Sequence, residues 1–367
     1  MTGLETLDAS RAIAAVAEGE TTVEAIVMAT LARVRERQPV VQAYDFCDPV
    51  IALRQARAAR GPLAGMTVAV KDMIDTADQP TQHNSTVYAG HRPAEDAADV
   101  SILRSAGAVI FGKADTHEFA AAGRWPKARH PLDQTRTPGG SSSGSAAAVA
   151  DFQAQIAIGT QTAGSLLRPA SFCGLVALKP THGLVSREGA KPYAFALDTI
   201  GFHARSVADI ALLARLFDLD RGGGARPKPL AELKVGLCRG PFWARAEPAS
   251  QAAVIRTAAA LRTSGVRVVD VDLPQSFGAL AEHQRVVMRH EGRSTFLAMA
   301  RRHGADLHAD FHEHVANADG YTRAQVRAAT DAIAAARPVF DDIAAGYDAL
   351  LTPVSYTHLR AHETWLT

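Results

Sequence analysis

The sequence has 367 residues, of which 47% are hydrophobic and 21% charged, and its 39 basic and 38 acidic side chains give a formal net charge of +1. This composition is typical of globular proteins and excludes disordered and fibrous classes. The length allows one large domain or two of ordinary size, and the absence of a dense basic run argues against a nucleic-acid-binding protein.

The first residues predict two helices with identifiable starts. Asp8 is a candidate N-cap for a helix over residues 9–20. Thr21 or Thr22 is a candidate N-cap for a second helix over residues 23–38, where apolar residues recur at helical spacing.

Two short apolar runs then predict buried strands. The run MTVAVKD over residues 66–72 ends abruptly in Lys71 and Asp72. A helical pattern over residues 99–108 leads into the second run, AVIFGKA, over residues 108–114. Helices that alternate with short apolar strands indicate an α/β layer fold.

The second half of the chain continues this alternation. An apolar strand after Gln153 leads into a glycine-punctuated turn and further buried segments, and an amphipathic helix is expected over residues 204–219. The Gly- and Pro-rich segment 221–232 is the best candidate for a linker. Beyond it we expect a strand over 234–238, a helix over 252–264, a strand over 266–274, two long helices, and a strand over 347–353.

We expect one domain over residues 1–353, with the linker near 221–232 inside it, and a non-native tail over residues 354–367. The tail contains VSYTHLRAHET, which shows no periodicity linked to the preceding residues. It resembles one reading frame of a transposon-end adapter used in DNA library preparation, so the natural sequence would stop near Pro353 and the fold would be truncated. An ordinary polar C-terminal tail is the alternative.

The three cysteines, Cys47, Cys173 and Cys238, are far apart and odd in number, which argues against a disulfide framework and a CxxC metal site. The first residues lack the basic region and apolar core of a signal peptide, and no apolar run reaches the roughly 18 residues of a membrane span. We therefore expect a soluble, cytoplasmic protein that uses no metal or other cofactor and binds neither membrane nor nucleic acid.

Residues 137–150, TPGGSSSGSAAAVA, combine glycines and serines with a small-residue helix start. A phosphate-binding P-loop would need a lysine within this stretch. Residues 140–144 match the nucleophile elbow with Ser142 at the centre, but that motif requires a strand leading into the serine, and the preceding polar residues end in Pro138. A flexible linker seldom leads directly into an alanine-rich helix and a buried strand.

Four motifs along the chain occur in one order: MTVAVKD over 66–72, GKADTHEF over 112–119, TPGGSSSGSAAAVA over 137–150 and GTQTAGSLLRPASFCGLVALKPT over 159–181. Together they resemble the amidase signature family of serine hydrolases. The resemblance implies an α/β fold with a large, mixed, twisted β-sheet core flanked by helices on both faces. It also implies an enzyme that hydrolyses a C–N amide bond through an acyl-enzyme.

The resemblance assigns a Ser–cis-Ser–Lys triad, with Ser165 as nucleophile, Ser141 as bridging serine and Lys71 as base. A serine hydroxyl needs an adjacent base before it attacks. Lysine serves as that base when it is neutral, and burial at the end of an apolar strand lowers its pKa from about 10.4. Taken singly, each of these residues is also explained as a helix cap or a structural polar group.

The family places a cis peptide bond before the bridging serine, here Gly140–Ser141, and Ser142 is expected to support it as a hydrogen-bond partner. The oxyanion hole is implied at the backbone N–H groups of Thr162, Ala163, Gly164 and Ser165. Two residues depart from the commoner DTGGS pattern, because Gln161 replaces aspartate and Ala163 replaces glycine. Alanine keeps its N–H group, so the hole survives if the backbone angles suit a residue with a Cβ.

Cys173 raises the alternative of a thiol hydrolase, with Lys113 and Glu118 as companions. A small buried cysteine that fills space is the simpler interpretation.

Arg168 indicates the substrate class. It follows Ser165 by three positions, as in malonamidases, where this arginine binds the free carboxylate of a short substrate. Its planar fork accepts a carboxylate bidentately, although an arginine paired with a structural acid is the alternative. We therefore expect a small carboxylated amide such as malonamate as substrate.

Two other functions stay open. One is the glutamine-hydrolysing amidase component of a tRNA-dependent amidotransferase, and the other is a non-catalytic relative that binds amides. The intact Lys71, Ser141 and Ser165 argue against the second. A small-molecule amide is the expected partner, and a second copy of the chain, in a homodimer, is a further candidate.

Overall fold

The computed structural model describes residues 3–220 and 228–354. Residues 221–227 of the predicted linker over 221–232 lie outside the described residues. Residues 355–367 of the predicted tail also lie outside them. The origin of the tail and the single domain over 1–353 therefore stay predictions.

The chain packs as two compact units, which are described separately. Of the described residues, 3–220 and 294–316 belong to the first unit, and 228–293 and 317–354 belong to the second.

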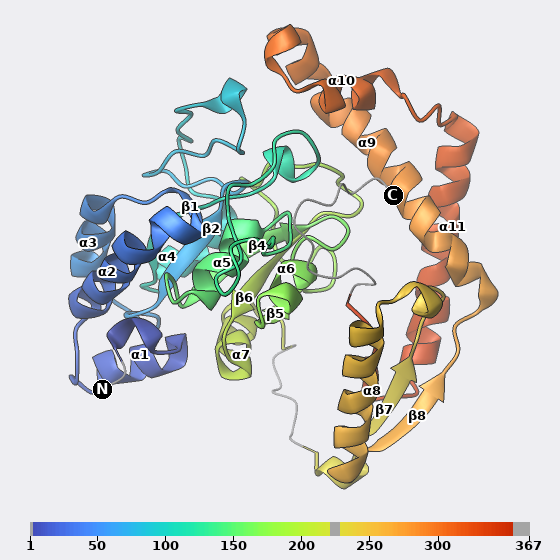
Figure 1. The fold of residues 1–367 in the computed structure, drawn as a ribbon, viewed down its shortest axis with the longest axis horizontal. Helices are drawn as coiled ribbons and strands as arrows, with labels where there is room; N and C mark the ends of the chain where they lie inside the picture. The colour runs from blue at the N-terminus through green and yellow to red at the C-terminus, as the bar shows by residue number, and fades with distance from the viewer. Residues whose placement is uncertain (1–2, 221–227, 355–367) are drawn as a thin grey trace. The chain divides into compact units, whose positions relative to one another are not determined.

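The first unit is built on a six-stranded mixed sheet (Figure 1). Its strands are β1 Tyr44–Phe46, β2 Thr67–Lys71, β3 Val109–Ala114, β4 Ile156–Gln161, β5 Val176–Leu178 and β6 Thr199–Ala204. They lie in the order β1-β3-β2-β4-β6-β5. β2 runs parallel to β3 and β4, whereas β1 is antiparallel to β3, and β6 is antiparallel to β4 and β5.

β2 and β3, the strands predicted from the two apolar runs, are buried at every position. Successive side chains of a strand point to opposite faces of its sheet, so both faces are covered at these strands. β2 ends at Lys71 as predicted. The centre of the sheet therefore holds the residue that the sequence singles out as a base.

Helices flank this sheet: α1 Ala9–Ala17, α2 Val23–Val41, α3 Pro49–Ala58, α4 Ala98–Ser105, α5 Ser143–Ala150, α6 Leu167–Phe172 and α7 Val207–Leu216. The first unit also contains α10 Ala309–Ala316 and the end of α9 Leu280–His303, which begins in the second unit. Short 3₁₀ helices cover residues 4–6, 86–88, 118–120 and 304–306. Within the described part of the chain, no helix has the length and apolar character needed to cross a membrane.

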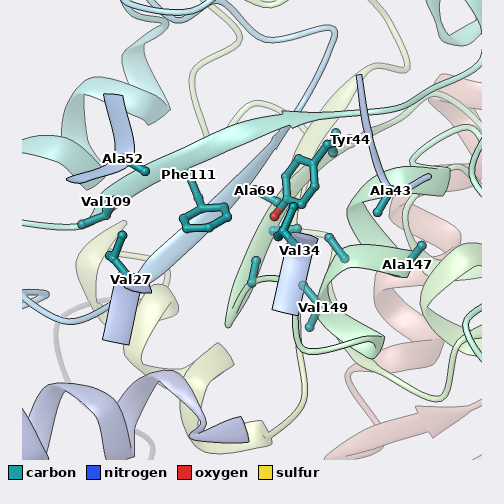
Figure 2. Close-up of a cluster of buried hydrophobic side chains, with 14 of the residues drawn as sticks. Val27, Val34, Ala43, Tyr44, Ala52, Ala69, Val109, Phe111, Ala147 and Val149 are labelled. Carbon is teal, nitrogen blue, oxygen red and sulfur yellow. The ribbon is translucent and has the colours of Figure 1, made fainter. Parts of the chain in front are cut away.

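A buried cluster joins α2, α3 and α5 to the sheet (Figure 2). It includes Val27 of α2, Ala52 of α3, Phe111 of β3 and Ala147 of α5. Small residues let α5 approach closely, because a Cβ at Gly144 would overlap the carbonyl oxygen of Ala43. The alanine-rich end of the Gly/Ser stretch is thus a core helix and not a linker.

The predicted helix caps are confirmed at α2 and corrected at α1. Thr22 accepts a hydrogen bond from the N–H of Ala25 and begins α2. Asp8 stands at the N-cap position of α1, but its carboxylate pairs with Arg205 and accepts no bond from the helix. The N–H groups of Ala9 and Ser10 donate to Asp209 instead, so a distant carboxylate caps this helix.

The second unit contains a three-stranded parallel sheet in the order β8-β7-β9. Its elements are β7 Lys234–Cys238, α8 Pro248–Thr263, β8 Arg267–Val271, α9 as far as residue 293, α11 Arg323–Ala344 and β9 Ala349–Leu351, with 3₁₀ turns over 230–232, 243–245 and 275–279. The predicted β-α-β arrangement is confirmed. α8 begins earlier than predicted because Pro248 suits the first helical position.

Candidate active site

Lys71, the last residue of β2, has a fully buried side chain. Its Nζ lies 2.8 Å from Ser141 Oγ and 2.8 Å from Thr160 Oγ1. Burial lowers the pKa of Lys71 well below its usual value, and the Asp198 carboxylate opposes this effect. A buried lysine whose pKa is lowered accepts protons at pH values where an exposed lysine stays charged.

Thr160 orients the lysine amine. Its Oγ1 and its carbonyl oxygen lie 2.8 Å and 3.5 Å from Lys71 Nζ, respectively. A neutral amine has two N–H donors and one lone pair. When the two N–H groups point at Thr160, the lone pair faces Ser141 Oγ, which is the direction that proton transfer from this serine needs.

The Gly140–Ser141 peptide bond is cis, as the resemblance implied. Thr116 Oγ1 donates a 2.8 Å hydrogen bond to the carbonyl oxygen of Ser141. A Cβ at residue 140 would lie 2.5 Å from Cε1 of the buried His117 ring, so this position requires glycine. Gly140 therefore supports the backbone path that places Ser141 beside Lys71.

Ser142 stands at the N-cap of α5 and points back to β4. Its Oγ donates a 3.2 Å hydrogen bond to the carbonyl oxygen of Thr160, and its N–H donates to the carbonyl oxygen of Ser165 at 3.2 Å. These bonds bring the segment that contains Ser141 next to the segment that contains Ser165. No strand leads into Ser142 among the described residues that precede it, so the nucleophile-elbow geometry is absent there.

Ser165 lies in the turn between β4 and α6, and 9% of its surface is exposed. Gln161 fixes this turn, because its Oε1 accepts 3.0 Å hydrogen bonds from the N–H groups of Leu166 and Leu167. Glutamine thus satisfies the helix start although aspartate is commoner here. Ala163 does not adopt a positive φ, so the alanine that replaces glycine fits the turn.

The backbone N–H groups of Ala163 and Gly164 form no hydrogen bond with any described part of the chain. Gly164 contributes its carbonyl oxygen, which accepts from the N–H of Arg168. An oxyanion hole needs backbone N–H groups that are available to the developing charge. The turn leaves those of Ala163 and Gly164 available, and the roles of Thr162 and Ser165 stay predictions.

Arg168, on α6, contacts the same region. Its Nη2 donates a 2.7 Å hydrogen bond to the carbonyl oxygen of Gly140, and a Cβ at Gly164 would lie 3.0 Å from its Nη1. The guanidinium group thus lies between the cis peptide and the oxyanion turn. This backbone carbonyl is a partner that neither sequence interpretation of Arg168 included, and binding of a substrate carboxylate or of a structural acid stays a prediction.

Sequence reasoning missed four residues of this site. Thr116, His117 and Thr160 lie inside the family-like motifs, but their types alone gave no signal. Asp198 lies outside every motif. Burial, together with Lys71 and Arg168, lowers the pKa of His117 to about 3, so this imidazole is neutral near pH 7.

A pocket adjoins the site. Thr160 and Thr162 line it, together with Asp198 and the cationic side chains of Arg187 and Lys191. Burial lowers the pKa of Lys191. Cationic side chains in a concave site favour a ligand that bears a negative charge.

The thiol-hydrolase alternative is not supported. Cys173 Sγ donates to the carbonyl oxygen of Pro138 at 3.5 Å, and burial raises the pKa of Cys173 to about 12, which disfavours the reactive thiolate. Lys113 forms an ion pair with Asp72, and Glu118 accepts a bond from Ser85. Cys173 and its two proposed companions thus contact different partners.

A family model described as Amidase matches residues 25–366. The chain belongs to the amidase family. This amidase is 33% identical over 406 residues to a glutamyl-tRNA(Gln) amidotransferase component of Chloroflexus aggregans, an alignment that covers 97% of this chain and 83% of that protein. The same amidotransferase component of Chloroflexus aurantiacus (strain J-10-fl) is 38% identical over 307 residues, and there the alignment spans 63% of the relative.

The fold prediction for this amidase is confirmed. A solved structure described as a crystal structure of amidase superimposes with a TM-score of 0.85 at 28% identity, over 98% of this chain and 84% of that chain. Both the family and this structure support an amide-hydrolysing enzyme. The curated relatives above are amidotransferase components, so they do not favour the predicted likeness to malonamidases.

Replacing Thr160 with valine is expected to lower kcat for amide hydrolysis by about 10–100-fold, while KM changes little. Valine keeps the shape but removes the hydroxyl that orients Lys71, so general-base assistance is impaired. Steady-state kinetics measure both constants. Thr160→Ser keeps the hydroxyl and is the matched control; a valine variant as active as the serine variant contradicts this role.

Proposed function

We propose that this amidase hydrolyses a primary carboxamide through an acyl-enzyme on Ser165. The observation that supports this best is the 2.8 Å approach of the buried Lys71 Nζ to Ser141 Oγ. Neutral Lys71 takes the proton of Ser141, which takes the proton of Ser165 as its oxygen attacks the carbonyl carbon. The N–H groups of Ala163 and Gly164 stabilise the developing oxyanion.

The same relay runs in reverse when the C–N bond breaks. Lys71 returns the proton through Ser141 to the departing nitrogen, so that ammonia leaves and Ser165 holds the acyl group. Water then attacks this ester and gives its proton to the relay, and the relay returns that proton to Ser165 Oγ as the carboxylic acid leaves and ionises. Each half-reaction leaves the triad in its starting protonation state, which catalytic turnover requires.

The substrate that we propose is a carboxamide of the glutamine type. The relatives named as amidotransferase components support a role in which this chain releases ammonia from such an amide for a partner enzyme. The cationic pocket residues Arg187 and Lys191 suit a carboxylate on the substrate. Malonamate, predicted from Arg168, carries the same group and is the second candidate. The cytoplasmic location and the homodimer stay predictions.

Ammonia release from a panel of amides tests this proposal. The panel contains glutamine, asparagine, malonamate and the neutral amide propionamide, assayed with the full chain. Release from glutamine above the other amides is expected. Faster release from malonamate overturns the substrate assignment, and release from none, with no labelling of Ser165 by a fluorophosphonate, favours a non-catalytic amide-binding protein.

Replacing Arg168 with methionine separates the two interpretations of this arginine. If it binds a substrate carboxylate, KM rises sharply for glutamine and malonamate but not for propionamide. If it holds the Gly140 carbonyl, kcat falls for charged and neutral amides alike. Comparison of KM and kcat across the panel measures the difference, and equal losses on all amides refute the substrate-binding role.

A further inference from the structure

Asp198 is the one site residue that lies outside every motif, and it immediately precedes β6. β6 pairs antiparallel with β4, and the register places Thr199 opposite Gln161. This pairing brings Asp198 next to Thr162, the first residue of the oxyanion turn. The position thus depends on strand pairing and not on sequence proximity.

The Asp198 carboxylate has three donors on two separate segments. Its Oδ1 accepts a 2.6 Å hydrogen bond from Thr162 Oγ1. Its Oδ2 accepts from the N–H groups of Tyr193 and Ala194, at 2.8 Å and 3.0 Å. One side chain therefore connects the oxyanion turn to the segment that lines the adjoining pocket.

Asp198 is also the anionic group that acts on Lys71. Its charge favours the lysine ammonium and opposes the effect of burial on the pKa of Lys71. Lys71 also acts on His117 and His203, whose pKa values burial lowers to about 3 and about 4, so both are neutral near pH 7. Arg168 acts on His117 from α6, and Arg187 lies beside Asp198.

We propose that Asp198 is a positioning residue for amide hydrolysis, which holds the oxyanion turn through Thr162. This inference rests on the proposed function of Ser165. It assigns Asp198 no contact with the reacting atoms. Its effect is therefore expected in kcat and in the pH dependence, and not in substrate binding.

Asp198→Asn tests the proposal. Asparagine keeps one oxygen for the N–H groups of Tyr193 and Ala194, but its N–H₂ group can only donate to Thr162 Oγ1, so a weaker neutral bond replaces the charge-assisted one. The turn is then held less firmly, and kcat is expected to fall by about 10–100-fold while KM stays near the wild-type value. Loss of the negative charge lowers the pKa of Lys71 further. Neutral lysine is then available at lower pH, so the acidic limb of the activity profile shifts to lower pH.

A second variant and a control separate positioning from general damage. Thr162→Val removes one bond to Asp198 but keeps the charge, so kcat falls and the acidic limb does not move. Asp209→Asn removes another buried carboxylate that accepts two backbone N–H groups, here those of Ala9 and Ser10 at the start of α1. This control is expected to keep the wild-type kcat and pH profile.

The rate of Ser165 labelling by a fluorophosphonate as a function of pH gives a readout that needs no known substrate. The inference is overturned if Asp198→Asn leaves both kcat and the acidic limb of the pH profile unchanged. It is also overturned if only KM increases, because Asp198 would then be a substrate contact. If that variant does not fold, an unaffected kcat in Thr162→Val overturns it. A wild-type chain that is neither labelled nor active overturns the proposed function as well.

Discussion

Replacing Ser165 with alanine is expected to lower amide hydrolysis by about 10⁴–10⁶-fold and to abolish labelling by a fluorophosphonate. The loss is large because the acyl-enzyme cannot form without this hydroxyl. The fold should persist, since the segment is held by backbone groups: the Ser165 carbonyl accepts from Ser142, and Gln161 holds the N–H groups that follow. Ammonia release and mass spectrometry of the labelled protein measure the two effects.

Ser142→Ala is the matched control for this experiment. Ser142 occupies the centre of the elbow-like match, but its hydroxyl donates to the Thr160 carbonyl. Its removal is expected to weaken activity while leaving the labelling of Ser165 intact. Labelling that disappears in Ser142→Ala and persists in Ser165→Ala would identify Ser142 as the nucleophile and reject the proposed triad.

Replacing Lys71 with methionine is expected to lower the turnover rate by about 10⁴-fold or more. The same change is expected to raise the free energy of unfolding at neutral pH by about 1 kcal/mol or more. Activity is lost because no base remains beside Ser141. Stability is gained because methionine fills a similar volume without the desolvation that burial imposes on the lysine ammonium. Opposite changes in activity and stability are typical of a catalytic group held in an unfavourable environment.

The stabilisation by Lys71→Met is expected to depend on pH. The folded chain has a lowered Lys71 pKa, whereas the unfolded chain has the ordinary value of about 10.4. Between these values the unfolded state binds more protons, so wild-type stability rises with pH and the advantage of methionine shrinks. Melting temperatures of both proteins between about pH 6 and about pH 10 measure this; a constant difference contradicts it.

Lys113→Met provides the contrast within the same sheet. Lys113 is equally buried, but it pairs with Asp72 at 3.6 Å and donates to the Ile74 carbonyl oxygen. Its removal leaves a buried carboxylate without its cation, which costs about 3–5 kcal/mol. A loss of stability in Lys113→Met and a gain in Lys71→Met would separate a structural lysine from a catalytic one.

The local elements of the fold were predictable because each is encoded by neighbouring residues. The apolar runs predicted β2 and β3, and Thr22 predicted the start of α2. The order of strands in the sheet was not predictable in this way, because β2 lies between β3 and β4, which are distant in sequence. The capping of α1 by Asp209 instead of Asp8 has the same cause.

The residues of the candidate site divide in the same way, into those that a local motif encodes and those whose position depends on the fold. Lys71, Ser141 and Ser165 lie in motifs, so the resemblance named them, and the structure places Lys71 beside Ser141. Asp198 depends on the pairing of β6 with β4, which no local pattern encodes. Arg168 was noticed from its spacing, but its bond to the Gly140 carbonyl depends on the backbone path of a separate loop.

The adjacent charges at the end of β2 constrain how the length of this strand can change. Lys71 contacts Ser141, while the next residue, Asp72, contacts Lys113 and accepts from the N–H of Gln82. Deletion of one residue within Thr67–Lys71 would turn the side chains of Lys71 and Asp72 to the opposite faces of the sheet, because a one-residue slip reverses every side chain of a strand. The Asp72 carboxylate would then enter the catalytic centre, and the Lys71 amine would face Lys113. Length changes here are therefore tolerated in loops before residue 66 but not in β2 itself.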